Sequence, residues 1–259
     1  MFEVLLCAIS FELNLLFGCL ATIFIIHSLI MNEFVDNLIV VAHPDDEILG
    51  FGGSGALLAS RGECIQSIIL SGDVTARQMR PSDQELHNDI LTANCLLGFQ
   101  PPVLGPFPNI EMNVVPHLKL VQFIESQIEL FQPRRVFTHH PRDLNDDHSC
   151  VAKACLAAVR LGQRRSEVRM VESVHFMEVL SSTDWSFPGY QPPFEPNLFV
   201  GIGNLVERKI DALSCYRHVM RDFPHPRSRE VLTGLAAYRG GQCGLPYAEA
   251  FQTVFQLGL

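Results

Sequence analysis

Short apolar runs alternate along the chain with segments whose apolar residues recur at helical spacing. The run 38–41 (LIVV) is the clearest of the first kind, because it is rich in β-branched residues and ends abruptly at polar ones. Runs of this kind are typical of buried parallel strands. Further strands are expected at residues 63–70, in the proline-rich segment 101–108, and at 135–138, 168–180 and 199–202.

Helical spacing occupies most of the intervening segments. Strands that alternate with helices predict an α/β fold in which helices cover both faces of a mostly parallel sheet. Helices are expected at residues 47–61, 82–97, 116–131, 148–161 and 204–220, in a segment that ends at Tyr238, and in a last amphipathic segment through Ala248, Phe251, Val254 and Phe255.

The first expected strand ends in a cluster of polar residues: His43, Asp45, Asp46 and Glu47. In open α/β sheets, ligands bind just beyond the carboxyl ends of the strands. One imidazole and two carboxylates in that place can supply two metal ligands and a spare base, as a metal-assisted hydrolase requires. The alternative is that the acids only cap the next helix, since each acidic side chain stabilises a helix N-terminus by about 0.3–1 kcal/mol.

A second His/Asp cluster, which follows the expected strand 135–138, favours the metal site. Two such clusters at the ends of two strands are hard to explain as separate helix caps. The residues alone leave the ligand set open, and the aspartate of the first pair that is not a ligand would act as general base. The candidate ligands are His43, one of Asp45 and Asp46, and one or more of His139, His140 and His148.

A glycine-rich segment, residues 50–55, matches the dinucleotide-binding pattern GxGxxG, and Asp73 lies near the distance expected for a ribose-binding acid. That pattern must open directly off the strand, so that the pyrophosphate meets the helix N-terminus. Residues 43–47 occupy this turn instead, and the glycines fall inside the expected helix. We therefore interpret the glycines as positions of close helix–sheet packing.

Composition limits the classes of function. A chain of 259 residues with 47% hydrophobic content can bury a sizeable core as one domain. The net charge of −9 and the presence of only three lysines argue against a nucleic-acid-binding surface. The eight cysteines are scattered without a CxxC pair, which indicates a reducing compartment and a cytoplasmic location.

The first thirty residues form a separate problem. Residues 15–31 have about the minimum length for a bilayer span, but no Lys or Arg precedes Arg61. Three interpretations are open: a membrane anchor, a packed extra helix, or residues upstream of the functional protein, and we favour the third. The expected division is an apolar segment, 1–30, and a single catalytic domain, 31–259. A protein that starts at Met31 should then be soluble and active, and loss of either property would contradict this division.

Residues 42–47 (AHPDDE) and 140–148 (HPRDLNDDH) together resemble the PIG-L/LmbE-like family of zinc-dependent N-acetylglucosaminyl deacetylases. The resemblance extends from about residue 36 to the C-terminus. It implies a Rossmann-like three-layer α/β sandwich that hydrolyses an N-acetyl group from an amino sugar and releases acetate. The implied partners are a small-molecule amino sugar and, as often in this family, further copies of the chain. The implied cofactor is Zn²⁺, with Fe²⁺ as the alternative, because two imidazoles and a carboxylate accommodate either metal.

The resemblance also assigns roles to individual residues. His43, Asp46 and His148 would be the metal ligands, and Asp45 would be the general base. The resemblance also implies that Arg77 binds sugar hydroxyls or a phosphate. We expect His140 and Arg227 to bind substrate as well, and Asp147 to orient a neighbouring group, because the adjacent His148 takes the ligand role.

One position departs from the family pattern. Many members carry a histidine three residues before the last metal ligand, where this chain has Asn145. Asparagine can donate a hydrogen bond to an oxyanion, which is worth about 2.7–4 kcal/mol in other enzymes, but it cannot transfer a proton. We expect His225, in the run PHPRS, to be the missing acid. The alternatives are His140, or Asp45 acting as both base and acid.

Two other functions are compatible with the motifs. Asn145 keeps open a metal-binding or sugar-binding homologue that has lost catalysis. His43, Asp45 and His148 also match, by residue type, the two-histidine, one-carboxylate site of non-haem Fe(II) oxygenases. Such oxygenases normally use a β-barrel, which the alternation of strands and helices does not predict.

Overall fold

The apolar runs pair into one sheet in the computed structural model, which describes residues 34–76, 79–187 and 192–258. Neighbouring strands from β1 to β5 are parallel, and β7 is antiparallel to β5 and β6. The sheet is therefore mostly parallel, as expected. Its order is β3-β2-β1-β4-β5-β7-β6. The strands are β1 Asn37–Val41, β2 Ile65–Ile69, β3 Val103–Leu104, β4 Arg135–His139, β5 Ser173–Met177, β6 Leu198–Gly201 and β7 Ala248–Gln256.

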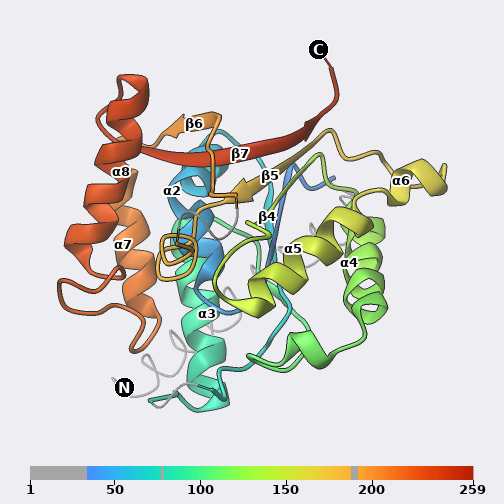
Figure 1. Ribbon diagram of the computed structural model, residues 1–259, viewed down its shortest axis with the longest axis horizontal. Helices are drawn as coiled ribbons and strands as arrows, with labels where there is room; N and C mark the ends of the chain where they lie inside the picture. Colours follow the sequence, from blue (N-terminus) through green and yellow to red (C-terminus); the bar gives the residue numbers. More distant parts are fainter. Residues whose placement is uncertain (1–33, 77–78, 188–191, 259) are drawn as a thin grey trace, which may run out of the picture. The chain divides into compact units, whose positions relative to one another are not determined.

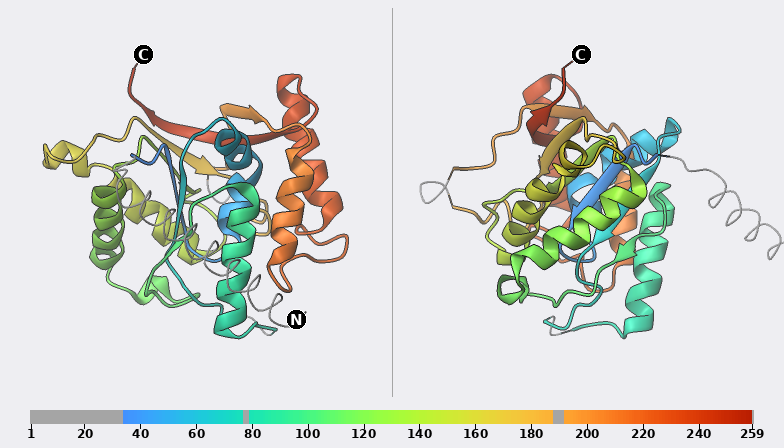
Figure 2. Two further views of the ribbon diagram at one scale, coloured as in Figure 1. Left: turned by 180° about the vertical axis from the view of Figure 1, so that it is seen from behind. Right: turned by 90° about the vertical axis from the view of Figure 1, so that its right-hand side faces the viewer.

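Helices cover both faces of this sheet (Figure 1). Along β1, Ile39 and Val41 pack with residues of α2, α3, α7 and α8, whereas Leu38 and Val40 pack with α4 and α5 on the opposite face. This alternation follows from the two-residue period of a strand. The result is the expected three-layer α/β sandwich, seen from two further directions in Figure 2. The helices are α2 Asp46–Ser60, α3 Asp83–Leu97, η1 Met112–Val114, α4 His117–Phe131, α5 Asp146–Ala158, α6 Leu161–Arg164, α7 Leu205–Cys215 and α8 Arg229–Cys243.

The prediction of a last helix through Ala248 is wrong, because this segment is strand β7. Its apolar residues fit helical spacing, but its backbone pairs with β5 along one edge and with β6 along the other. Pairing on both edges and burial of Phe251 in the core outweigh the local pattern. Two other elements, β5 and α7, are shorter than their expected ranges, and α5 begins at Asp146, before His148.

The glycines of α2 lie inside the helix and allow it to approach its neighbours closely. A Cβ atom on Gly53 would lie 2.8 Å from Ile202, and one on Gly50 would lie 3.0 Å from Met177. A Cβ atom on Gly55 would overlap the ring of Phe99. The packing interpretation of these glycines is therefore confirmed.

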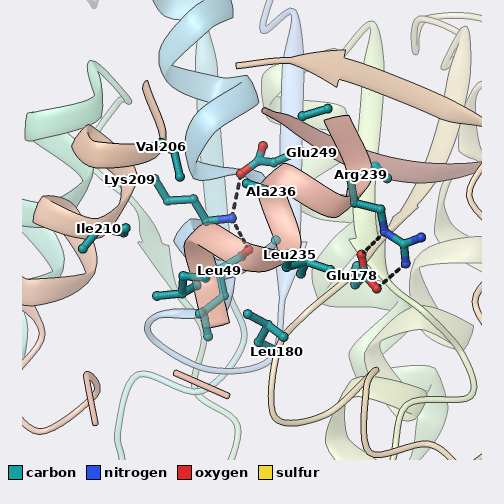
Figure 3. A pocket seen from close by; sticks show the side chains of 14 residues that line it. Leu49, Glu178, Leu180, Val206, Lys209, Ile210, Leu235, Ala236, Arg239 and Glu249 are labelled. Atoms are coloured by element: carbon teal, nitrogen blue, oxygen red, sulfur yellow. Dashed lines mark hydrogen bonds and ion pairs between the residues drawn. The ribbon is translucent and has the colours of Figure 1, made fainter. Parts of the chain in front are cut away.

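A buried ion pair joins α2 to α7 and β7 (Figure 3). The Lys209 ammonium donates to Glu249 at 2.7 Å and to the backbone carbonyl of Leu49 at 2.6 Å. The Glu249 carboxylate also accepts from the backbone N–H groups of Gly53 (2.9 Å) and Ser54 (2.7 Å). The charges are therefore paired and hydrogen-bonded, as buried charges must be.

Within the described ranges, the helices are too short or too polar to cross a membrane. Residues 15–31 lie outside those ranges. The expectations about this segment, and the division between residues 30 and 31, stay predictions.

Candidate active site

The two His/Asp clusters meet because the strands that precede them are neighbours. Strand β1 pairs in parallel with β4, and Val40 lies opposite Thr138 in the register. Their carboxyl ends therefore lie side by side at one edge of the sheet. His43 follows β1 directly, His139 is the last residue of β4, and the loop after β4 leads into α5.

Three buried side chains bring their donor atoms together at this edge. Asp46 Oδ2 lies 3.4 Å from His43 Nδ1 and 3.2 Å from His148 Nε2, and one donor atom of each residue lies within 4.8 Å of the others. Imidazole nitrogens and a carboxylate oxygen are typical zinc ligands. His43, Asp46 and His148 can therefore hold a metal ion.

A carboxylate lies behind each of these histidines. His43 uses its other nitrogen, Nε2, to contact Asp147 at 2.8 Å, and His148 uses Nδ1 to contact Asp143 at 2.9 Å. Asp147 is fixed in turn by the backbone N–H groups of Ile110 (2.7 Å) and Met112 (2.9 Å). Carboxylates in this position fix the orientation and tautomer of metal-binding histidines, so the arrangement fits a metal site.

His139 lies beside this group and forms, with Asp143 and His148, a second set of donor atoms within 4.8 Å of one another. Its Nε2 atom accepts the backbone N–H of Ala42 at 2.8 Å, which leaves the ring proton on Nδ1 in the neutral tautomer. Burial and the neighbouring His148 hold the pKa of His139 well below its usual range. The ring stacks on that of His148, with centroids 3.8 Å apart. Nε2 of His139 is therefore occupied, and the ring of His139 supports that of His148.

The charges at the site favour an ionised Asp46. Burial alone would raise the pKa of Asp46, but His148 and His43 outweigh burial and hold that pKa well below its usual range. Burial likewise opposes charge on His148, yet Asp46 and Asp143 raise the pKa of His148 to about 10. The acids thus create a place where a cation is stabilised, either as a proton on His148 or as a bound metal ion.

Asp45, between the two proposed ligands of the first cluster, is held from two sides. Its Oδ2 atom accepts from Arg227 Nη1 at 3.1 Å, and Arg227 Nε donates to Ser181 Oγ at 2.8 Å. The Asp45 backbone has φ 103° and ψ −25°, which lies in the left-handed region. Its backbone N–H donates to Glu47 Oε2 at 3.1 Å.

Glu47 is a site residue whose role the sequence did not indicate. It is fully buried, and its other carboxylate oxygen accepts from Asn94 Nδ2 at 2.9 Å and from the Tyr216 hydroxyl. Burial raises the pKa of Glu47 to about 7, against the effect of these two hydrogen bonds. The only sequence signal was a third consecutive acid in AHPDDE, which also fits helix capping.

A cavity of about 210 Å³ opens onto these groups. Asn145 lies on its wall as the N-cap of α5, where its Oδ1 atom accepts the backbone N–H of Asp147 at 3.0 Å. The amide nitrogen of Asn145 is thus the part of this side chain able to donate elsewhere. The cavity is lined by His43, Asp45, Asp46, Ala76, Asn109, Ile110, Asn145, His148, Ser181, Ser182 and Arg227.

Two residues expected in the site, His140 and His225, are not among the described residues that line this cavity. His140 is buried between the rings of Phe176 and Phe194, at centroid distances of 5.6 and 5.8 Å. His225 accepts the backbone N–H of Arg227 at its Nδ1 atom, and its ring lies 6.1 Å from that of Trp185. Arg77 lies outside the described residues. Their roles stay predictions.

The family described as GlcNAc-PI de-N-acetylase, PIG-L, matches residues 38–159, the part of the chain that carries both clusters. This part of the chain is a PIG-L domain. No curated protein matches the chain. The match to the family model, combined with the donor set of His43, Asp46 and His148, supports a metal-binding deacetylase of the PIG-L/LmbE-like type.

Solved structures share the fold. The conserved protein TT1542 from Thermus thermophilus is 26% identical, with a TM-score of 0.70 over 87% of this chain and 97% of that one. The N,N′-diacetylchitobiose deacetylase from Pyrococcus horikoshii is 18% identical, with a TM-score of 0.69 over 85% and 83%. GalB, a 4-carboxy-2-hydroxymuconate hydratase from Pseudomonas putida KT2440, is 20% identical, with a TM-score of 0.71 over 87% and 98%. A deacetylase and a hydratase thus share this fold, so the reaction has to be argued from the site.

Proposed function

We propose that this PIG-L protein is a metal-dependent hydrolase that removes the N-acetyl group from an N-acetylglucosamine-type amino sugar or its conjugate. The observation that carries the proposal is the meeting of His43, Asp46 and His148 beside Asp45 in one cavity. The two carboxylates behind the histidines and the family match support it.

His43, Asp46 and His148 would hold the metal, with Zn²⁺ as the first candidate and Fe²⁺ as the second. A metal ion held there would polarise the amide carbonyl and lower the pKa of a water molecule towards about 7. Asp147 and Asp143 would accept a hydrogen bond from the outer nitrogen of each histidine, which fixes the ring and leaves the nitrogen that faces the site to bind the metal.

Asp45 is the proposed general base that takes a proton from the attacking water. Arg227 fixes one oxygen of this carboxylate through a hydrogen bond from its guanidinium group. Asn145, on the wall of the same cavity, would donate a hydrogen bond from its amide nitrogen to the developing oxyanion.

The leaving amine needs a proton, which Asn145 cannot supply. Asp45 lines the cavity, whereas His225 and His140 do not, so we assign the return of the proton to Asp45. His225 is the alternative acid. An unchanged kcat in His225→Ala supports Asp45 in both roles, and a fall of more than about 100-fold supports His225.

The substrate and the setting are further parts of the proposal. Arg77 would bind sugar hydroxyls or a phosphate, with His140 and Arg227 as the other proposed substrate contacts. The catalytic domain would span residues 31–259 and act on a small molecule in the cytoplasm. Free cysteines in the described part of the chain, such as Cys155, are compatible with a reducing compartment.

The test compares the wild-type chain with Asp45→Asn on N-acetylglucosamine and its glycosides, with acetate release and bound metal as the readouts. We expect Asp45→Asn to lower kcat by about 10²–10⁴-fold, because general base catalysis contributes that much, and to keep its metal. Equal acetate release by the two proteins would contradict the role of Asp45. Release of no acetate by the metal-loaded wild type would contradict the proposed function and favour a non-catalytic homologue.

A further inference from the structure

The backbone of Asp45 adopts a conformation that needs support. A φ of 103° places this aspartate in the left-handed region, which costs a residue other than glycine about 1–3 kcal/mol. Surrounding contacts must compensate for that cost. The carbonyl of Asp45 accepts from Leu49 N–H at 2.9 Å, as in any helix start, and its own N–H donates to Glu47 Oε2.

The Glu47 carboxylate that receives this N–H is itself held by two distant elements. Asn94 lies in α3 and Tyr216 caps the end of α7, and both donate to Glu47 Oε1. All three residues are buried, with exposed fractions of 0% for Glu47, 0% for Asn94 and 2% for Tyr216. The acceptor of the Asp45 N–H is therefore anchored in the core of the protein.

We propose that Glu47, fixed by Asn94 and Tyr216, is a positioning residue that holds the Asp45 backbone in its left-handed conformation and so aims the Asp45 carboxylate into the cavity. This inference rests on the proposed function of Asp45. Glu47 would hold the backbone of Asp45, while Arg227 holds its side chain. A displacement of about 1 Å at a reacting group can cost about 100-fold in rate.

The variant Glu47→Gln tests this role with a minimal change of shape. The carboxylate of Glu47 accepts hydrogen bonds from three donors: the Asp45 N–H, Asn94 and Tyr216. A glutamine has only one oxygen, so either the Asp45 N–H or the Asn94 amide must face an NH₂ group. The variant Tyr216→Phe removes one donor from the opposite side of Glu47 and leaves the Asp45 contact in place.

A matched control, in strand β7, contacts the same helix. Glu249 is also a buried carboxylate that accepts backbone N–H groups of α2, from Gly53 and Ser54, and it pairs with Lys209 (Figure 3). These contacts lie further along the helix than Asp45. The variant Glu249→Gln therefore makes the same chemical change beside α2 without altering the support of Asp45.

The experiment measures kcat, KM, bound metal and Tm for the full-length, metal-loaded variants. We expect Glu47→Gln to lower kcat about 10–100-fold, with KM and metal content within about twofold of wild type. Tyr216→Phe should lower kcat in the same direction and by less. Glu249→Gln should lower Tm and leave kcat unchanged. An unchanged kcat in Glu47→Gln, or an equal loss of kcat in Glu249→Gln, would overturn the inference.

A second readout separates this inference from the proposed function. Hydrogen exchange at the Asp45 amide, followed by NMR, reports the Glu47 contact whether or not acetate is released. We expect exchange about tenfold or more faster in Glu47→Gln than in Glu249→Gln. If the wild type releases no acetate, the proposed function fails, and the exchange rates still decide the inference. Equal Asp45 exchange in the two variants would overturn it.

Discussion

Each histidine of the proposed metal site uses both ring nitrogens. His148 directs Nε2 to Asp46 and Nδ1 to Asp143, and His43 directs Nδ1 to Asp46 and Nε2 to Asp147. The outer carboxylates therefore determine which nitrogen of each histidine faces the site. Loss of one of these carboxylates should weaken metal binding more than it alters the fold.

We predict that Asp143→Ala weakens zinc binding by about 10–100-fold, because carboxylates behind metal-binding histidines contribute about that much. The measurement is the zinc Kd, obtained by competition with a chromogenic chelator. The control is Asp146→Ala, since Asp146 is an exposed acid in the first turn of the same helix. Equal zinc Kd values for the two variants would show that Asp143 does not support His148.

At the scale of single residues, sequence could predict the candidates more readily than their roles. The position of His43 directly after a strand marked it as a candidate ligand, and the cluster after β4 offered His148 as one of three candidate histidines. The choice of His148 over His139 as metal ligand depends on the backbone N–H of Ala42, which occupies Nε2 of His139. The spacing of residues in the sequence does not reveal this contact. The partners of Glu47 could not be predicted, because Asn94 and Tyr216 come from α3 and α7 and carry no motif.

Among the elements, helix α5 links the stability of the fold to the cavity of the proposed active site. Asn145 is its N-cap and also lines the cavity, so one side chain serves the helix through its oxygen and the cavity through its amide nitrogen. These two roles can be separated, because an aspartate can cap a helix but cannot donate a hydrogen bond when ionised.

We predict that Asn145→Ala lowers the free energy of unfolding by about 1 kcal/mol, whereas Asn145→Asp keeps it within about 0.5 kcal/mol of wild type. Both variants should lose kcat by about 10²-fold or more, because neither offers a donor to the oxyanion. Chemical denaturation and acetate release measure the two effects. A normal kcat in Asn145→Asp would remove the amide nitrogen from the mechanism.

The elements also differ in how well the local sequence pattern predicts them. Strand β1 and helix α3 could be predicted because their patterns agree with their tertiary surroundings. Strand β7 could not be predicted, because its apolar residues also fit a helix. Its pairing partners, β5 and β6, are only five and four residues long and lie far away in the sequence. Long-range pairing decided the structure there.

In the molecule as a whole, the sheet buries a titratable residue, His175, that is not part of the cavity lining. His175 lies in β5, bonded to Thr253 and Ser173 at 2.9 and 2.8 Å and stacked on Phe137. Burial, with a smaller contribution from Arg135, lowers the pKa of His175 to about 4. Folding therefore keeps this histidine neutral at a pH at which the unfolded chain would protonate it.

This shift predicts acid sensitivity of the fold. The contribution of His175 is complete above the unfolded pKa of 6.5 and is lost as pH falls towards 4, because only the unfolded state binds the proton in that range. The loss amounts to about 3 kcal/mol at most. The gap in unfolding free energy between wild type and His175→Gln should therefore shrink from pH 7.5 to pH 4. A gap that stays constant would contradict this account.

We propose that His43, Asp46 and His148 hold the metal ion on which deacetylation by this protein depends. The most direct test is to titrate the metal-free, full-length chain with Zn²⁺ and to measure acetate release from an N-acetylglucosamine-type substrate. We expect no acetate release without metal, a rise in proportion to added zinc, and a plateau at one equivalent per chain. Acetate release that is unchanged by metal removal, or absent at every zinc level, would contradict this proposal.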